Sequence, residues 1–94
     1  MAKLMILRKI IPQPGRIPEA IKWMKEKEKD RQKHGQITQL LARSSTDPSE
    51  YLFIQVWESK DAYERWKNSD DRAALAKERQ LLLAHDPVLF YEML

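Results

Sequence analysis

Two aromatic residues near the middle of the chain, Tyr63 and Trp66, have the spacing that places side chains on one face of a helix. Such a pair can wall a pocket for a flat aromatic ligand, because each ring combines a large apolar surface with an O–H or N–H group at one edge. Aromatic residues at helical spacing also serve simply as core. The residues alone leave both interpretations open.

A single charged residue, Arg8, lies on an otherwise apolar strand face with Ile6 and Ile10. A buried guanidinium is costly unless it is paired, so it must reach a carboxylate, backbone carbonyls, solvent or a ligand anion. Glu92 is the expected structural partner, because the last strand lies beside the first in the fold predicted below. In the alternative, Arg8 lies in a pocket and holds a phenolate or a developing oxyanion.

The two histidines are better explained by helix ends than by catalysis. His34 precedes Gly35 at the end of the first helix and His85 ends the last one, where a positive charge complements the helix dipole. Their spacing matches no metal-binding motif and the chain has no cysteine, so we expect no metal site. Asp70 and Asp71 stand at a helix start, where they complement the dipole rather than form a catalytic carboxylate pair.

Length and composition predict one domain over residues 1–94 that gains stability from a partner. The 17 Lys and Arg and 14 Asp and Glu give a net charge of +3, and the two signs are interleaved along the chain. A nucleic-acid binder usually concentrates its positive charge, so we expect no nucleic-acid partner. The N-terminal apolar run is broken by Arg8 and is too short to enter a membrane. We therefore expect a soluble, cytoplasmic protein.

Hydrophobic periodicity and turn residues divide the chain into strands and helices. Strands are expected at residues 3–11, 36–43, 51–57 and 87–93, and helices at 17–33, 59–67 and 70–84. Gly35 ends the first helix, whereas Ser59 and Ser69 are placed as N-caps of the later ones. The second half of the first helix is nearly all charged and is expected to face water. The inner stripe of the last helix is expected to be Ala74, Leu75, Leu81 and Leu82.

This order of elements predicts the α+β class and a ferredoxin-like βαββαβ arrangement, with a four-stranded antiparallel sheet and helices on one face. The first, third and fourth strands are nevertheless apolar on both faces, whereas a half-solvated sheet alternates apolar and polar residues. An exposed apolar sheet face is an association surface. We therefore predict a symmetric homodimer in which two sheets pack face to face into an α+β barrel.

Three short segments carry a family resemblance: Val56-Trp57-Glu58-Ser59, Asp61-Ala62-Tyr63 and Trp66-Lys67-Asn68-Ser69. They resemble the strand-to-helix corner of the antibiotic biosynthesis monooxygenase (ABM) family, and the likeness covers nearly the whole chain. The resemblance implies a dimeric α+β barrel, each subunit with a pocket between sheet and helices. Members of this family include cofactor-independent monooxygenases of quinols and polycyclic phenols, haem-degrading enzymes and aldehyde-processing relatives.

Haem degradation is disfavoured by the residues at the family's functional positions. The haem-degrading branch uses an Asn on the first strand, a Trp in the second helical region and a His further along. Trp66 matches the Trp, but Arg8 and Ala76 replace the other two. Without an imidazole to ligate iron, we expect neither this reaction nor a cofactor.

The leading hypothesis is a cofactor-independent monooxygenase of a small aromatic, a quinol or polycyclic phenol, bound between sheet and helices. Arg8, Tyr63 and Trp66 are the candidate ligand-binding residues, and Arg8 and Trp66 the candidate catalytic ones. The alternative is a non-catalytic small-ligand-binding or assembly module with the same dimeric barrel, which the lack of an evident general base favours. An RNA-recognition domain shares the element order, but its basic, glycine-containing motif is missing.

Overall fold

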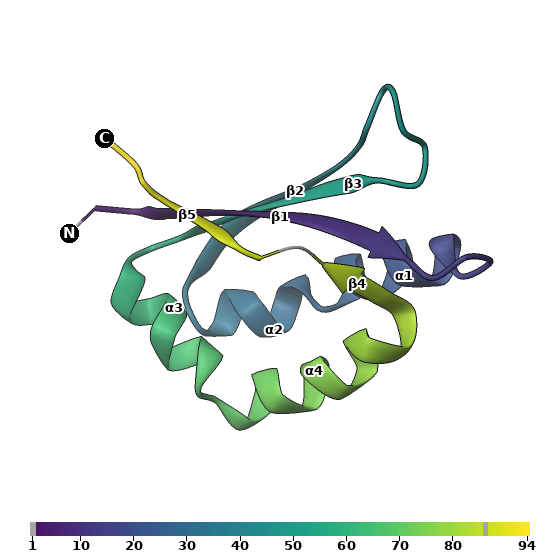
Figure 1. Ribbon diagram of the computed structural model, residues 1–94. Helices are drawn as coiled ribbons and strands as arrows, with labels where there is room; N and C mark the ends of the chain where they lie inside the picture. Colours follow the sequence, from purple (N-terminus) through teal and green to yellow (C-terminus); the bar gives the residue numbers. More distant parts are fainter. Residues whose placement is uncertain (1, 86) are drawn as a thin grey trace.

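The computed structural model describes residues 2–85 and 87–94 and has two layers. All the labelled helices lie on one face of a twisted antiparallel sheet, and the opposite face is left uncovered (Figure 1). The last strand lies beside the first as its antiparallel neighbour, near the two chain ends (Figure 1). This arrangement confirms the predicted α+β, ferredoxin-like class.

The sheet is formed by β1 (Leu4–Pro12), β2 (Gln36–Arg43), β3 (Tyr51–Trp57), β4 (Leu83–His85) and β5 (Leu89–Glu92). Its order is β2-β3-β1-β4, and β5 also pairs with β1. The predicted fourth strand corresponds to β5, which is shorter than expected, and β4 is an additional strand, so the sheet has five strands rather than the predicted four. Both lie on the same side of β1, with β4 opposite its last residues and β5 opposite its first. The residues of β4 were expected to end the last helix, and that prediction is wrong. Of the expected break at residues 86–87, Asp86 lies outside the described residues.

The helices are α1 (Ile17–Glu26), α2 (Glu28–Lys33), α3 (Lys60–Lys67) and α4 (Asp70–Leu82). The single helix expected over residues 17–33 is therefore broken at Lys27. Its second half does not simply face water, because Arg31 is only 6% exposed. The Arg31 guanidinium donates to the carbonyl of Met24 in the last turn of α1, across 3.4 Å. A carbonyl in that position lacks a helical partner, and Arg31 supplies one.

The face that α4 turns toward the sheet differs from the predicted stripe. Leu75 is buried and Leu82 half-buried, as expected, but Ala74 and Leu81 are exposed. The inner face instead follows positions 72, 75, 76, 79 and 82, which have the regular spacing of one helix face. Arg72 and Arg79 therefore point toward the sheet side of α4, where apolar residues were expected.

Both predicted N-caps are confirmed. The Ser59 hydroxyl accepts a hydrogen bond from the backbone N–H of Ala62 across 3.1 Å, and the Ser69 hydroxyl accepts one from Arg72 across 3.2 Å. Gly35 ends α2 with a φ of +112°, a backbone conformation that favours glycine. These local signals position α3 directly after β3, so that Tyr63 and Trp66 face the sheet.

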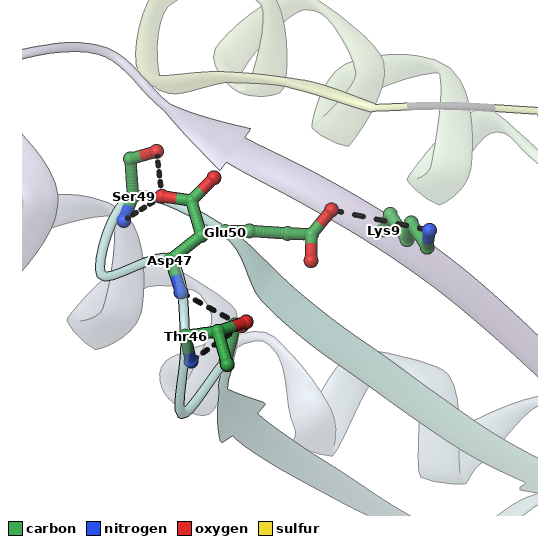
Figure 2. Close-up of polar contacts among 6 residues, drawn as sticks. Lys9, Thr46, Asp47, Ser49 and Glu50 are labelled. Atoms are coloured by element: carbon green, nitrogen blue, oxygen red, sulfur yellow. Dashed lines mark hydrogen bonds and ion pairs between the residues drawn. The ribbon is translucent and has the colours of Figure 1, made fainter.

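The hairpin between β2 and β3 is closed by side-chain hydrogen bonds rather than by glycine (Figure 2). The Asp47 carboxylate accepts from the backbone N–H of Ser49 across 3.0 Å and from its hydroxyl across 2.7 Å. These two bonds lower the pKa of Asp47 below its ordinary value. An ion pair of 3.9 Å between Lys9 and Glu50 ties the end of the turn to β1.

The uncovered sheet face is largely apolar. In the paired registers, the large apolar side chains that point away from the helices are Met5, Leu7, Leu40, Leu52, Ile54, Val56, Leu89 and Tyr91. The same registers also place the polar residues Thr38 and Lys9 on this face. Leu40 is 62% exposed, and Leu89 and Tyr91 are about half exposed. Separately, none of the described helices is long and apolar enough to cross a bilayer.

Candidate active site

The side chain of Arg8 lies on the helix side of the sheet, between the buried residues Ile6 and Ile10 of β1. Its Nη2 donates a hydrogen bond to the hydroxyl of Tyr63 across 3.2 Å. Its Nε is buried and has no hydrogen-bond partner among residues 2–85 and 87–94. Burial lowers the pKa of Arg8 and Arg72 adds to this effect, whereas Tyr63 opposes it.

Glu92 is not the partner of Arg8, and that prediction is wrong. The last strand does lie beside the first, as expected, but its register places Glu92 opposite Leu4. Leu4 is four strand positions from Arg8, about 13 Å along β1. Strand adjacency alone therefore did not bring the two charges together, and a neutral hydroxyl takes the place of the expected carboxylate.

A small cavity of about 40 Å³ lies between the sheet and the helices beside Arg8. Its lining comprises Arg8, Ile10, Phe53 and Gln55 of the sheet, Trp23, Met24, Arg31, Trp66, Leu75, Ala76 and Arg79 of the helices, and Leu83 and His85 of β4. A water molecule needs about 10–15 Å³ of such space. The cavity therefore has room for about three non-hydrogen atoms of a ligand and not for an aromatic ring.

The two aromatic residues predicted as ligand walls occupy different places. Trp66, 4% exposed, lines the cavity, and its ring lies 4.9 Å from that of His34. Tyr63, 5% exposed, contributes instead to a larger groove of about 770 Å³ between α3 and the β1–β5 edge. The Tyr63 ring packs against Trp57 and Phe90, at 5.4 and 5.6 Å between centroids. Both rings are thus part of the core, and Arg8 connects the two spaces through the Tyr63 hydroxyl.

Two further arginines line the same cavity, and neither was identified from the sequence. Burial lowers the pKa of Arg31 to about 10, and the charge of Arg8 adds to this effect. Burial also lowers the pKa of Arg79, with contributions from Arg72 and Arg8. No Asp or Glu of the described part of the chain lines the cavity. The space is therefore strongly electropositive.

A chain of glutamine side chains extends from the cavity to the edge of the sheet. Gln55 donates to Gln36 across 2.8 Å, Gln36 donates to Gln39 across 3.3 Å, and Arg31 donates to the same Gln39 oxygen across 3.0 Å. The carbonyl oxygen of Gln55 is buried without a hydrogen-bond partner in the described residues. The cavity lining thus contains one unsatisfied donor, on Arg8, and one unsatisfied acceptor. Gln55 stands out in the sequence as the polar member of the inner row Tyr51, Phe53, Gln55 and Trp57.

The histidines take separate roles. His34 caps the end of α2, as expected, and its Nε2 lies 3.0 Å from the carboxylate of Asp71 in the first turn of α4. His85 belongs to β4 rather than to a helix end, pairs with Ile10, and lines the cavity. Within the described ranges, no group of three His, Asp or Glu side chains is arranged to hold a metal ion.

The protein therefore has a ferredoxin-like α+β fold with a small cavity between its sheet and its helices, lined in part by Trp66 of α3. Residues 5–78 match the model of the antibiotic biosynthesis monooxygenase family. The chain therefore belongs to that family, and the resemblance noted in the sequence is confirmed. Among curated proteins, none matches the chain.

Solved structures with the same fold have low sequence identity to this chain. SnoaB, a cofactor-independent oxygenase from Streptomyces nogalater, is 15% identical with a TM-score of 0.84, over 97% of this chain and 92% of that one. A protein of unknown function from Bacteroides thetaiotaomicron, described as a possible oxidoreductase, is 16% identical with a TM-score of 0.81, over 98% of each chain. A protein of unknown function from Nitrosomonas europaea is 18% identical with a TM-score of 0.76, over 100% of this chain and 91% of that one. At these identities the likeness shows the fold alone.

Proposed function

We propose that this protein is a cofactor-independent monooxygenase that acts on a small aromatic substrate, a quinol or polycyclic phenol. Membership of the antibiotic biosynthesis monooxygenase family supports this reaction class. The observation that carries the proposal for this chain is Arg8, a guanidinium among buried apolar residues whose Nε still lacks a partner among the described residues. Such a group is suited to hold the oxygen of an ionised phenol.

The reaction needs little acid–base chemistry from the protein. An electron-rich phenol, once ionised, passes an electron to dioxygen by itself, and the two radicals then combine. In an anthrone, one oxygen atom replaces the two hydrogens of the reacting methylene, and these leave in water with the second oxygen atom. The protein binds the substrate, excludes water and stabilises the anion. Arg8 is the proposed electrostatic partner, Trp66 a wall, and Tyr63 orients Arg8 and contributes to binding.

The size of the cavity limits how the substrate is bound. About 40 Å³ accommodates the oxygen-bearing edge of a phenol beside Arg8, but its ring requires side chains to move. Half-buried Trp23, Ala76 and Arg79 are the lining residues of α1 and α4 that reach the surface. We therefore place the entrance between α1 and α4.

A non-catalytic module is the second candidate function, and a specific observation favours it. Tyr63 and Trp66 are almost fully buried, and the space between sheet and helices is small. A site filled in this way needs no substrate to complete it. In this alternative the aromatic residues are core, and the protein binds a small ligand or only assembles.

We further propose that the protein is a homodimer in which the uncovered sheet faces pack together. Burial of several hundred Å² of apolar surface at about 25 cal/mol per Å² contributes on the order of 10 kcal/mol before association costs. Sedimentation velocity at micromolar concentration tests this proposal. A stable monomer would contradict it.

Oxygen uptake distinguishes the two candidate functions. An oxygen electrode with a panel of quinols and anthrone-like phenols is expected to show turnover, and Arg8→Gln to lower kcat/KM by about a hundredfold or more. Arg43→Gln is the matched control, because Arg43 is exposed on β2, away from the cavity. Trp66→Phe tests whether the indole of Trp66 contributes to substrate binding as a wall of the cavity. Binding of the same compounds without oxygen uptake by the wild type would favour the non-catalytic module.

A further inference from the structure

Positive charge is concentrated around the small cavity beside Arg8. Arg8 comes from the sheet, Arg31 from α2 and Arg79 from α4, and the three side chains line the same space of about 40 Å³. Three positive charges around so small a space repel one another unless an anion lies between them. A phenolate and a carboxylate each supply one negative charge, but a carboxylate offers two oxygen acceptors to this cluster of donors and a phenolate offers one.

The surrounding protein supplies little compensation. Of the three, only Arg31 is stabilised by carboxylates, those of Glu28 and Asp30 on its own helix. Neither Arg8 nor Arg79 has an ion pair within the described part of the chain. Burial lowers the pKa of all three arginines, and neighbouring arginines add to this effect: Arg72 at Arg8, Arg8 and Arg79 at Arg31, and Arg72 and Arg8 at Arg79. Within the described residues, the positive charges of Arg8 and Arg79 are therefore not compensated by an ion pair.

The size and hydrogen-bonding groups of the cavity indicate the kind of anion. Room for about three non-hydrogen atoms corresponds to one carboxylate group. Guanidinium groups present a planar fork of donors that matches the two oxygens of a carboxylate. The unpartnered, buried Nε of Arg8 is one donor already available for such a contact.

We infer that this cavity binds the carboxylate group of an aromatic acid, and that the guanidinium groups of Arg8, Arg31 and Arg79 hold the carboxylate. The ring of the acid lies at the entrance between α1 and α4, against the half-buried indole of Trp23, which Glu78 of α4 holds through a hydrogen bond. The inference of a carboxylate-binding site rests only on the geometry and charge of the cavity. Its extension, that the substrate is a hydroxylated aromatic acid, rests on the proposed function and places the carboxylate, rather than the phenolic oxygen, beside Arg8.

Calorimetric titration of the purified protein with benzoate, benzamide and acetate tests the binding site. Benzoate is expected to bind at millimolar concentrations or below, and benzamide, its neutral isostere, much more weakly. Arg79→Gln is expected to weaken benzoate binding by about tenfold or more, because a charged ligand loses a charged partner. Lys77→Gln is the matched control on the exposed side of α4 and is expected to change the affinity by less than about twofold.

A charge-neutral variant gives a second test. Ala76→Leu fills part of the cavity from the side of α4 and is expected to abolish benzoate binding. Circular dichroism before titration shows that each variant is folded. No benzoate binding by the wild type, equal binding of benzamide, or an Arg79→Gln protein with unchanged affinity would overturn the inference. Acetate binding as tightly as benzoate would overturn the aromatic assignment in favour of a free small anion.

Oxygen uptake with dihydroxybenzoate and with hydroquinone separates this inference from the proposed function. Faster oxidation of the acid, with the advantage lost in Arg79→Gln, supports both. Arg79-dependent benzoate binding without oxidation of either compound supports the anion site and removes the oxygenase. Equal oxidation of both compounds without benzoate binding overturns the anion site and leaves the oxygenase intact.

Discussion

Arg8 of β1 donates a hydrogen bond to the hydroxyl of Tyr63 on α3 across 3.2 Å. This bond joins the first strand to α3, and both lie within the residues 5–78 that match the family. It also supplies a partner to one nitrogen of a guanidinium whose Nε has none among the described residues. The hydrogen bond between Arg8 and Tyr63 therefore contributes to stability and also orients the Arg8 guanidinium, which is proposed to bind an anion.

Tyr63→Phe removes this acceptor and keeps the ring. We expect the free energy of unfolding to fall by about 1–3 kcal/mol, because a buried charged donor loses its partner. Urea denaturation followed by circular dichroism measures the change. Tyr51→Phe is the control, since Tyr51 is as buried as Tyr63 but makes no side-chain hydrogen bond within the described residues. Equal losses in the two variants would show that the Arg8 contact contributes nothing.

The parts of the fold that the sequence predicted are those with local causes. Ser59 and Ser69 cap their helices through their own hydroxyls, and Gly35 ends a helix by its own backbone conformation. Alternation placed β3 at residues 51–57, with the predicted bounds. Such signals need no knowledge of the rest of the chain.

The parts that the sequence did not predict depend on how elements meet. Arg31 lies in a charged run whose pattern does not distinguish it, and its burial depends on the break at Lys27 and on contacts with the Met24 carbonyl, Gln39 and Phe53. Arg79 became a cavity residue because α4 turns the positions of Leu75 and Leu82, rather than Leu81, to the sheet. Glu92 failed as a partner because adjacency does not determine register. Of the candidate residues, Arg8 and Trp66 share a cavity and Tyr63 reaches it only through Arg8.

The proposed dimer can be tested with two leucines of similar exposure on opposite sides of the protein. Leu40 is 62% exposed on the uncovered sheet face, and Leu81 is 68% exposed on α4. We expect Leu40→Lys to weaken the dimer, because a charge is placed in an apolar interface, and Leu81→Lys to leave it unchanged. Sedimentation velocity over a concentration series measures both. A larger effect from Leu81→Lys would place the interface on the helical layer.

The β2–β3 hairpin gives a pH-dependent prediction. Two hydrogen bonds from Ser49 hold the pKa of Asp47 below its ordinary value of 3.8. A carboxylate with a depressed pKa contributes stability that is present above pH 3.8 and is lost as the pH falls through the folded-state value. Ser49→Ala removes the 2.7 Å hydroxyl bond, so the pKa of Asp47 is expected to rise toward its ordinary value. Carbon-detected NMR titration of the carboxyl measures it, with Lys60→Ala as a distant control. An unchanged pKa would assign the whole shift to the Ser49 backbone.

The two glycines can be compared to measure how much a close contact of an added Cβ destabilises the protein. Both have positive φ, +80° at Gly15 and +112° at Gly35, so alanine is strained at each. At Gly15 an added Cβ meets nothing within 4 Å, whereas at Gly35 it lies 3.0 Å from the Cβ of Ala62. Ala62 is buried in the first turn of α3, and the Gly35 carbonyl accepts from the backbone of Glu58 across 3.0 Å, so neither side yields easily.

Gly15→Ala is therefore expected to lower the free energy of unfolding by about 1–2 kcal/mol, the cost of the left-handed backbone. Gly35→Ala is expected to cost about 3 kcal/mol or more, because the contact with Ala62 adds to that strain. Urea denaturation of both variants measures the difference. A shift of α3 in the Gly35→Ala variant also moves Trp66, so we expect weaker benzoate binding than in Gly15→Ala. Equal losses of stability would mean that α3 moves aside at no cost and that the junction between α2 and α3 is loosely packed.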